Sequence, residues 1–378
     1  MSLEKTKIAL IGSGCISETY LRNMTTRWNI LDVVGCSDLI EERSAHRAEQ
    51  FGIRQMTNEE ILNDPEIKIV VNTTYPTAHY EVSKAALLAG KNVHCEKMLA
   101  VTLEEGEELI ALAEQKGLKF GVAPDTFLGA SHQTARRIID SGWIGEPFMV
   151  QARVVRGYHP LMERMEDFSF VFKEGGGIPF DMGGYYLHDM IQLLGPVKRC
   201  GGFVQTRHPD RLCLNTKNPM YGKPLDIRTP NALVGALEFE NGVLGSIAFC
   251  SEGFGEYAGI EVYGTEGTLF VPDPNWFNGD VYLARKPSDE KFLVPYTHGY
   301  TAQCCRGLGV ADMAWALHNG RDNRTSGRLG LHVFEIVHGI WRGAQEGKLH
   351  EMKHMCKQPA ALPAGFTLPG EEERALDN

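Results

Sequence analysis

The sequence predicts an α/β protein built from two domains. At 378 residues the chain is longer than a single ordinary core accommodates. Up to about residue 125, short apolar runs alternate with amphipathic stretches, which is typical of a parallel sheet covered by helices. Beyond that point, apolar and polar residues alternate with the period of antiparallel strands. We therefore expect a first domain at 1–125, a second α/β domain at 126–362 and a frayed, charged tail at 363–378.

The first domain is predicted to alternate strands and helices. The strands are expected at 8–11, 33–36, 67–72, 92–95 and 119–122. The helices are expected at 16–26, 42–51, 78–88 and 103–115. Connections of this kind give a parallel sheet with helices on both of its faces.

The second domain is predicted to combine a large sheet with a few long helices. The strands are expected at 148–155, 197–205, 232–239, 243–249, 259–263 and 268–271. The helices are expected at 129–141, 181–194, 301–318 and 328–347. This order of strands and helices indicates a mixed domain in which helices lie against a mostly antiparallel sheet.

Composition excludes several classes of function. Hydrophobic residues make up 43% of the chain and charged residues 23%, the balance of a globular protein. The net charge is −10 and no long basic stretch occurs, which argues against nucleic acid or an anionic membrane as a partner. No stretch approaches the roughly 18 apolar residues that span a bilayer, and the N-terminal apolar run is too short for a signal peptide.

The nine cysteines favour a cytoplasmic location. Their number is odd, they are scattered, and they form no CxxC pair, which suits reduced thiols better than a disulfide framework. We interpret Cys304 and Cys305 as one buried and one partly exposed thiol. No metal-ligand spacing occurs, so we expect no bound metal.

A glycine-rich turn follows the first strand and reads GSGCIS over residues 12–17. Gly12 permits the tight turn, and Gly14 lets the backbone approach a pyrophosphate. Cys15 and Ile16 open the helix whose N-terminus faces the phosphates. The last position of the pattern is serine, which meets the need for a small residue less well than glycine or alanine. The turn predicts a Rossmann dinucleotide site, with a glycine turn in an unrelated α/β fold as the alternative.

Asp38 ends the second strand at the spacing expected of the acid that binds the adenosine ribose. Its carboxylate can accept hydrogen bonds from both ribose hydroxyls, whereas it would repel a 2′-phosphate. Leu39 follows in place of an arginine, although Arg43 and Arg47 lie within a turn or two. The sequence therefore predicts NAD as the cofactor without excluding NADP.

Two further motifs carry a resemblance to a known family. The end of the fourth long strand reads HCEKM over residues 94–98, and GGGIPFDMGGY occupies residues 175–185. Together with the glycine turn, these motifs resemble the Gfo/Idh/MocA family of glucose–fructose oxidoreductases, inositol dehydrogenases and rhizopine-catabolism oxidoreductases. The resemblance extends from about residue 5 to residue 350, and includes Pro76, His79 and the stretch 324–335.

The resemblance implies a Rossmann domain followed by an α/β domain with a large, mostly antiparallel sheet. Such a sheet often supplies the interface of a homo-oligomer, here a dimer or a tetramer. The substrate, a sugar or a polyol, lies between the domains over the nicotinamide. The residues expected at the cofactor are Gly12, Gly14, Cys15, Ile16, Asp38, Thr74, Pro76, His79, Glu96 and Lys97.

The lysine of the family's Glu-Lys-Pro motif falls on Lys97, at the carboxyl end of a parallel strand. Its ammonium can bind substrate hydroxyls and lower the pKa of a neighbouring acid or base; the alternative is a solvated surface lysine. Met98 stands where the family usually has proline. Because a cis bond before a residue other than proline costs about 2.5–4 kcal/mol, we expect a trans bond and a slightly displaced loop.

Asp181 and Tyr185 complete the predicted catalytic set with Lys97. They are one helical turn apart at the start of the expected helix 181–194 and so share a face. Relatives use histidine or tyrosine at the position of Tyr185. A phenol can donate a proton to a forming alkoxide, or accept one if its pKa of about 10 is lowered by Lys97. The alternative is a helix-capping aspartate beside a packed tyrosine.

Three further residues are candidates for substrate binding. Asp125, Tyr158 and His188 are expected at the substrate together with the three catalytic residues. Asp125 faces the crevice or caps the next helix, and His188 touches substrate or is a buried structural histidine. We expect His94 to belong to the core.

The predicted function is NAD-dependent hydride transfer to or from a hydroxyl or carbonyl carbon of a sugar or polyol. An aldose would become its lactone, or a secondary alcohol a ketone. An alternative is a glycosidase that uses bound NAD in a transient oxidation. A further alternative is a non-catalytic NAD-binding regulator, in which loss of Lys97 or Tyr185 would be expected, yet both are present.

Overall fold

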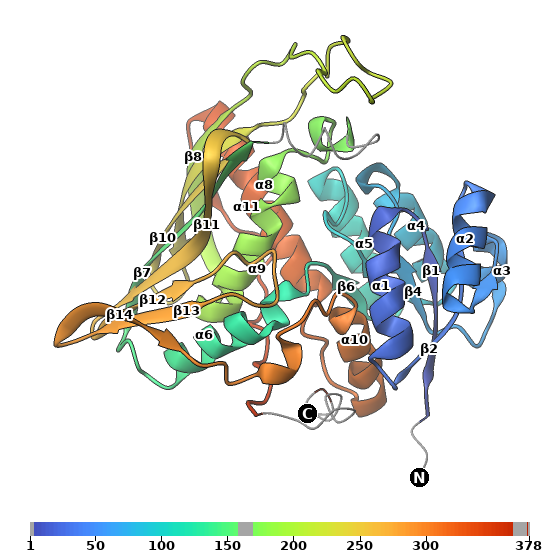
Figure 1. Cartoon of the computed structure of the whole chain (residues 1–378), viewed down its shortest axis with the longest axis horizontal. Coiled ribbons are helices and arrows are strands. Elements are labelled where there is room, and N and C mark those ends of the chain that lie inside the picture. Colours follow the sequence, from blue (N-terminus) through green and yellow to red (C-terminus); the bar gives the residue numbers. More distant parts are fainter. Residues whose placement is uncertain (1–3, 158–168, 366–375, 377–378) are drawn as a thin grey trace.

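The first domain is a parallel sheet between layers of helices (Figure 1). A computed structural model of the chain describes residues 4–157, 169–365 and 376. The six strands run in the order β3-β2-β1-β4-β5-β6, and all their pairings are parallel. They are β1 (Thr6–Ile11), β2 (Leu31–Ser37), β3 (Arg54–Gln55), β4 (Ile69–Asn72), β5 (Asn92–Cys95) and β6 (Phe120–Val122). The helices are α1 (Cys15–Thr26), α2 (Glu41–Phe51), α3 (Asn58–Asn63), α4 (Pro76–Leu88) and α5 (Leu103–Gln115).

The direction of winding reverses between β1 and β4, which lie side by side. Open α/β sheets bind ligands at this kind of switch point, outside the carboxyl ends of the strands. The glycine turn follows β1, and Thr74 and Pro76 follow β4. The predicted cofactor residues therefore meet at one edge of the sheet.

The second domain contains a nine-stranded sheet in the order β14-β13-β12-β11-β7-β10-β9-β8-β15. Every pairing is antiparallel except that of β7 with β10. The strands are β7 (Pro147–Gly157), β8 (Val197–Gln205), β9 (Ala232–Phe239), β10 (Leu244–Cys250), β11 (Glu252–Gly264), β12 (Gly267–Val271), β13 (Val281–Arg285), β14 (Ser288–Val294) and β15 (His350–Glu351). The predicted fold class is thus confirmed in both domains.

Helices cover one face of this large sheet and separate it from the first domain (Figure 1). They are α6 (Ala130–Asp140), α8 (Ile178–Asp181), α9 (Gly183–Leu194) and α11 (Gly327–Glu346), while α10 (Leu308–Asn319) packs against β6 of the first domain. Short 3₁₀ turns accompany them at η1 (Thr126–Leu128), η2 (Ser169–Phe172) and η3 (Gly299–Thr301). None of the helices among the described residues is long and apolar enough to cross a membrane.

The strand β13, which buries Val281 and Leu283, was not predicted although its apolar residues alternate. The other elements that were not predicted are short or exposed. β3 and β15 have two residues each, and the residues of β14 are exposed except Val294. The short helix α3 depends on a local capping box, in which Thr57 and Glu60 bond each other's backbone amides. Apolar periodicity cannot reveal such segments, because they bury almost no side chains.

Two helices begin later in the structure than the sequence predicts, those expected at 181–194 and at 301–318. The expected helix 181–194 is two helices, because α8 ends at Asp181 and α9 starts at Gly183. Consecutive glycines at 183 and 184 are weak helix formers, which favours a break here. The expected helix 301–318 begins only at Leu308, since Gly307 has a φ of +100° that a right-handed helix cannot contain. Residues 302–307 form a loop instead.

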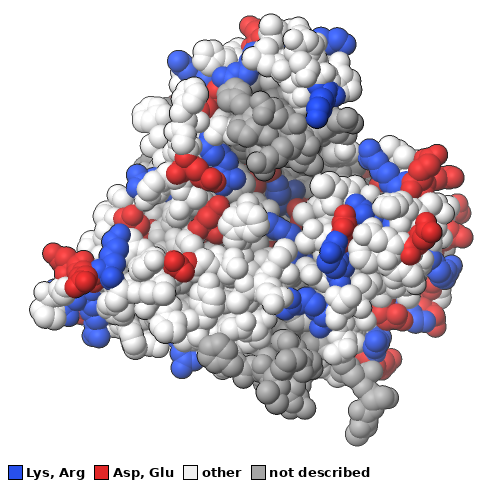
Figure 2. Space-filling model, in the orientation of Figure 1, with Lys and Arg blue, Asp and Glu red and all other residues white. Residues whose placement is uncertain are grey.

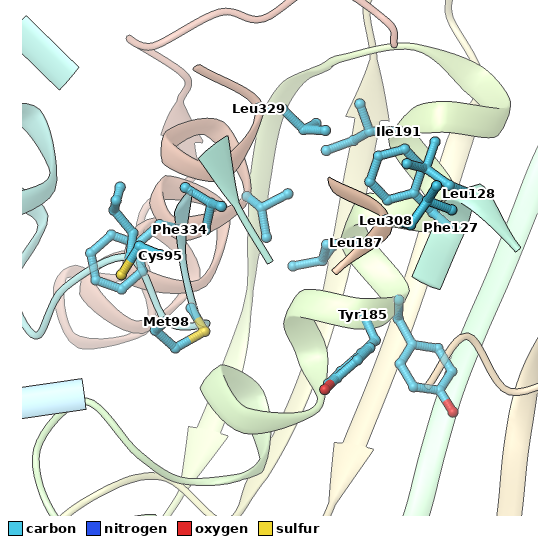
Figure 3. Packing of buried hydrophobic residues seen from close by; sticks show 14 of the residues in the cluster. Cys95, Met98, Phe127, Leu128, Tyr185, Leu187, Ile191, Leu308, Leu329 and Phe334 are labelled. Carbon is cyan, nitrogen blue, oxygen red and sulfur yellow. The ribbon is translucent and has the colours of Figure 1, made fainter. Parts of the chain in front are cut away.

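The C-terminal helices return to the first domain. Val122 of β6 donates its amide proton to Thr325 O at 2.9 Å, and Gly121 forms a bridge with Ser326 just before α11. Figure 3 shows side chains of both domains in one apolar cluster, among them Cys95 and Met98 of the first domain and Leu187 and Phe334 of the second. Each fully buried leucine contributes about 1.5–3 kcal/mol to folding, so this shared core holds the domains together.

Described parts of the predicted tail contact the rest of the chain. Pro363 O accepts a hydrogen bond from the Tyr300 hydroxyl at 2.8 Å, and Leu376 is buried. The remaining tail residues, 366–375 and 377–378, lie outside the described residues.

Asp125 caps the helix α10 from a distant part of the chain. Its Oδ2 accepts hydrogen bonds from the amides of Gly307 and Gly309, each at 2.9 Å, and the side chain is fully buried. Burial raises the pKa of Asp125 to about 6, although the two amides and the charge of Arg306 oppose that shift. The carboxylate therefore serves an N-terminus, where anions are favoured, and not the helix that follows it in sequence.

Replacing this cap should destabilise the protein. Asp125→Ala leaves two buried amides without an acceptor, so we expect a loss of about 1–3 kcal/mol in the free energy of unfolding. Asp125→Asn keeps an acceptor oxygen and should recover most of that loss. Urea unfolding measures both variants. Equal stability of the alanine variant and the wild type would show that Asp125 does not cap α10.

Candidate active site

The glycine turn has the geometry of a dinucleotide cradle. Gly12 has a φ of +100°, and a Cβ there would lie 2.6 Å from the Thr74 backbone nitrogen. A Cβ on Gly14 would meet nothing within 4 Å. No side chain caps the first turn of α1, so its amides remain available to an anion. Cys15 is exposed at this helix start, while Ile16 packs against the core.

Asp38 is fixed beside this turn by backbone amides. Its Oδ2 accepts a hydrogen bond from Ser13 N at 2.6 Å and its Oδ1 from Ile40 N at 2.8 Å. These bonds orient the carboxylate at the carboxyl end of β2, where a ribose binds in this fold. Arg47 pairs instead with Glu18 at 3.1 Å. The charge environment of Asp38 therefore favours ribose hydroxyls over a 2′-phosphate.

His79 joins the two loops that border the crevice. The ring is buried, with Nδ1 2.5 Å from Met98 O and Nε2 3.1 Å from Thr74 O. Burial lowers the pKa of His79, and a neutral ring donates from only one nitrogen, so the shorter contact from Nδ1 is the donated one. Pro76 is at the first turn of α4. These residues shape the loops, and the Nδ1 proton of His79 is already donated to a backbone oxygen.

Glu96 forms the buried floor of the site. Its Oε1 accepts a hydrogen bond from the Tyr20 hydroxyl at 2.7 Å, and its Oε2 accepts one from Lys97 N at 3.1 Å. The carboxylate is thus held between α1 and the loop after β5. Because both oxygens are bonded, the buried charge is compensated.

The Lys97–Met98 peptide bond is cis, so the expected trans bond is wrong. Met98 is buried, its carbonyl is held by His79, and its sulfur lies 3.7 Å from where a Gly184 Cβ would be. Contacts on both sides of the loop, from α4 and α9, thus favour the cis form of a residue whose own preference is trans.

Lys97 forms an ion pair with Asp181 across the domain boundary. The two side chains are 19% and 13% exposed, and so lie at the surface of the cleft. Burial would lower the pKa of Lys97, but Asp181, Tyr185 and Glu96 outweigh it and raise the pKa above its usual range. The raised pKa favours the ammonium form of Lys97, which can bind and polarise an oxygen.

Tyr185 lies beside this pair on α9. Its ring centroid is 5.8 Å from Lys97 Nζ, and the residue is only 6% exposed. Figure 3 shows the hydroxyl turned away from Leu187 and Ile191, at the edge of the apolar cluster. Burial raises the pKa of Tyr185, and the opposing charges of Arg306 and Lys97 do not cancel this. The condition that Lys97 lowers the pKa of Tyr185 below about 10 is therefore not met, and the resting phenol is protonated.

Sequence reasoning missed Arg306. Its Nη1 donates a hydrogen bond to the Tyr185 hydroxyl at 3.3 Å, and its Nη2 is bound by Asn275 O and Oδ1 at 3.1 and 3.0 Å. The interpretation of 301–318 as one helix hid this loop residue. The signal that could have revealed it is the pair Gly307 and Gly309, which bracket a helix start.

The other candidates are not brought to the Lys97–Asp181 pair. His188 is buried, bonds Gly184 O through Nδ1 at 2.7 Å and stacks on Phe127, with its pKa lowered by burial to about 4. His94 is fully buried, as expected of a core residue. Tyr158 lies outside the described residues. Figure 2 shows the surface hollowed between the two domains, with Lys and Arg atoms visible in the hollow.

Sequence comparison with known proteins agrees with this arrangement. Residues 6–123 match the Gfo/Idh/MocA group, described as an oxidoreductase family with an NAD-binding Rossmann fold, and residues 132–270 match its C-terminal domain. The chain is 31% identical over 243 residues to 1,5-anhydro-D-fructose reductase of Ensifer adhaerens, across 63% of this chain and 67% of that protein. It is 30% identical over 152 residues to the inositol 2-dehydrogenase/D-chiro-inositol 3-dehydrogenase of Lactiplantibacillus plantarum, across 39% of this chain and 43% of that protein.

Solved structures show the same fold over nearly the whole chain. Levoglucosan dehydrogenase in complex with NADH superposes with a TM-score of 0.80 over 93% of this chain and 100% of that one, at 20% identity. The WlbA dehydrogenase of Bordetella pertussis, in complex with NADH and UDP-GlcNAcA, gives a TM-score of 0.73 over 93% and 99%, at 19% identity. At these identities the likeness establishes the fold.

The two glycines of the turn should respond differently to alanine. Gly14→Ala adds a methyl group in open space, so folding should be unchanged while NAD binds at least about tenfold more weakly, a loss of about 1.4 kcal/mol. Gly12→Ala should unfold at a lower temperature, because its φ is positive and its Cβ meets backbone. Thermal unfolding and a fluorescence titration with NAD measure the two effects. Wild-type affinity in Gly14→Ala would show that no pyrophosphate passes this point.

Proposed function

The chain belongs to the Gfo/Idh/MocA family of NAD-binding oxidoreductases, and from this premise we propose that it transfers a hydride between NAD and a hydroxyl or carbonyl carbon of a sugar or polyol. The observation that carries the proposal is the Lys97–Asp181 ion pair with the Tyr185 ring beside it. An ammonium, a carboxylate and a phenol at the carboxyl ends of the strands can hold and protonate one substrate oxygen.

Each residue has a distinct task in this proposal. Lys97 binds the reacting oxygen through its positive charge and stabilises the alkoxide. Asp181 orients Lys97 and accepts a hydrogen bond from a neighbouring substrate hydroxyl. Bound NAD supplies or accepts the hydride.

Tyr185 is the proton carrier. In carbonyl reduction the carbonyl carbon gains the hydride, and the oxygen takes the proton of the Tyr185 hydroxyl, leaving a phenolate. Alcohol oxidation runs the same steps in reverse, with the phenolate accepting the hydroxyl proton. A resting phenol with a raised pKa is ready for the reductive direction.

The substrate class is inferred from the relatives. Two curated relatives are named for anhydrofructose and inositol, and a structural neighbour for levoglucosan, all of them sugars or polyols. Such ligands present several adjacent hydroxyls, which suits a site that offers an ammonium and a carboxylate side by side. Asp38 favours NAD over NADP as the partner of this reaction.

The protein is further proposed to be a cytoplasmic homo-oligomer, a dimer or a tetramer, that pairs through the open face of its large sheet. Phe203 and Val234 are direct cross-strand neighbours on that face and are 80% and 60% exposed, and Leu244 on β10 is 58% exposed. Apolar side chains grouped in this way are typical of an interface. All nine cysteines are free thiols, which suits a reducing compartment.

Removing one hydroxyl group tests the proposed chemistry. With NAD and a panel of aldoses, inositols and anhydrosugars, the wild type should turn over at least one compound, measured as NADH absorbance. Tyr185→Phe keeps the buried ring and should lower kcat by about 10²–10⁴ without changing the melting temperature. In carbonyl reduction the wild-type rate should fall as pH rises through the phenol's pKa, because the proton is then lost, and the variant should lack this limb.

Tyr300→Phe is the matched control, since it removes another buried hydroxyl that bonds only Pro363 O within the described residues. It should retain near-normal turnover. If Tyr185→Phe kept its rate within about threefold, a barrier change under about 1 kcal/mol, the proposed proton carrier would be wrong.

A charge on the open sheet face tests the oligomer. Val234→Glu should convert the oligomer to monomers in sedimentation experiments while leaving thermal unfolding of the subunit unchanged, because the side chain is largely exposed. Leu88→Glu is the control, since Leu88 is 57% exposed at the end of α4 in the first domain. An unchanged oligomer in Val234→Glu, or a monomeric wild type, would contradict this interface.

A further inference from the structure

The loop that precedes α10 brings a guanidinium to the Tyr185 hydroxyl. Arg306 Nη1 lies 3.3 Å from that oxygen, and the guanidinium carbon lies 5.5 Å from the centroid of the ring. Lys97 Nζ, in contrast, is bound to Asp181 and lies 5.8 Å from the ring centroid. The nearest hydrogen-bonded cation of the phenol is therefore Arg306 and not Lys97.

We propose that Arg306 holds the Tyr185 oxygen by a charged hydrogen bond and stabilises the phenolate that forms when Tyr185 gives up its proton. This inference rests on the proton transfer proposed above. An arginine side chain has five N–H donors and no acceptor, so it cannot take the proton itself. It binds a lone pair of the phenol and leaves the O–H free for a substrate oxygen. Among the residues that the structure describes, the Tyr185 hydroxyl donates to none.

The position of Arg306 is fixed from its other side. Asn275, in the loop between β12 and β13, binds Nη2 with both its backbone oxygen and Oδ1. Asp273 of the same loop accepts hydrogen bonds from the Tyr186 hydroxyl at 2.9 Å and from Arg156 at 3.2 Å. The guanidinium is therefore held on a loop that is itself tied to α9 and β7.

A buried histidine also anchors this loop. His132 Nε2 lies 2.8 Å from Trp276 O and Nδ1 lies 2.8 Å from Asp189, with both side chains of this ion pair fully buried. Burial would lower the pKa of His132, but Asp189 outweighs it and the pKa is raised, which suits a ring that donates from both nitrogens. The loop and the guanidinium of Arg306 are thus held in place before the substrate binds. A charge fixed in this way stabilises the charge that develops in a transition state without having to reorganise.

Other charged groups also act on the phenol. They are Lys97 and Asp181 at the cleft and Glu96 after β5, whereas Asp125 and Tyr20 act on the guanidinium of Arg306. Burial and the two acidic groups Glu96 and Asp181 raise the pKa of Tyr185, whereas Arg306 lowers it more than Lys97 does. Arg306 is therefore both the cation hydrogen-bonded to the Tyr185 hydroxyl and the charge that lowers the pKa of Tyr185 most.

A titration that needs no substrate tests the inference. A fluorinated tyrosine, whose phenol ionises at lower pH than that of tyrosine, is placed at position 185, and its ionisation is followed by ¹⁹F NMR in the full chain. Arg306→Gln should raise the midpoint by about one pH unit or more, a tenfold weaker acid. Arg306→Lys should restore part of the shift, because it keeps the charge but loses the planar fork.

Arg27→Gln is the matched control. Arg27 bonds Gln303 and Tyr300 O in the same stretch of chain, at 3.2 and 3.4 Å, and is not among the bonded partners of Tyr185. Its loss should leave the midpoint in place. A midpoint unchanged in Arg306→Gln, or moved as far in Arg27→Gln, would overturn the inference.

Kinetics separate this inference from the proposed function. With a substrate found in the sugar and polyol panel, Arg306→Gln should lower kcat/KM at least about tenfold and move the phenol's limb of the pH profile upward. The same change in a Tyr185→Phe background should have little further effect. A shifted ¹⁹F midpoint without any turnover would contradict the proposed function and leave the role of Arg306 intact. If the effects of the two variants on kcat/KM were fully additive, the role of Arg306 would be contradicted.

Discussion

The site depends on the apolar core that the two domains share. Lys97 follows β5, Tyr185 is on α9 and Arg306 precedes α10, so no local sequence relation sets the distances between them. Those distances follow from packing of α10 and α11 against β6 and of α11 against α9, within the apolar cluster of Figure 3. Close-packed interiors are nearly incompressible, and a core that crosses the domain boundary therefore fixes the catalytic geometry as firmly as a single domain would.

Charge compensation is the second constraint, because the cleft buries many ionised groups. Glu96 accepts hydrogen bonds from Tyr20 and a backbone amide, and Lys97 pairs with Asp181. Asp125 is compensated at one oxygen only, by the start of α10. An uncompensated charge at such depth would shift its pKa until it became neutral. The compensation is local and specific, and among the described residues it leaves the hydroxyl proton of Tyr185 without an acceptor, as the proposed proton transfer requires.

Most long elements could be predicted, and the failures share a cause. Most strands and helices with a buried apolar face appeared at their expected positions within a few residues, because periodicity reports burial directly. The exceptions are β13, which was not predicted, and β11, which begins at Glu252 and not at 259. The loop 302–307 was taken for helix because its neighbours are helical, and that error concealed Arg306. The Lys97–Met98 bond was expected to be trans from the preference of an isolated peptide, whereas contacts from His79 and Gly184 surround a cis bond in the folded chain.

The sequence by itself determined the class of fold, and it predicted the dinucleotide turn, the ribose-binding acid and, through the family resemblance, the lysine, aspartate and tyrosine of the proposed site. These features are local, because each is recognised from a short run of consecutive residues or from the spacing of apolar side chains along one segment. Only the tertiary structure decided that Asp125 caps a distant helix and that Arg306 is hydrogen-bonded to the phenol of Tyr185. It also decided that His79 and His188 each form a hydrogen bond through Nδ1 to a backbone oxygen. Contacts between residues far apart in sequence depend on how whole elements pack, and no spacing along the chain encodes them.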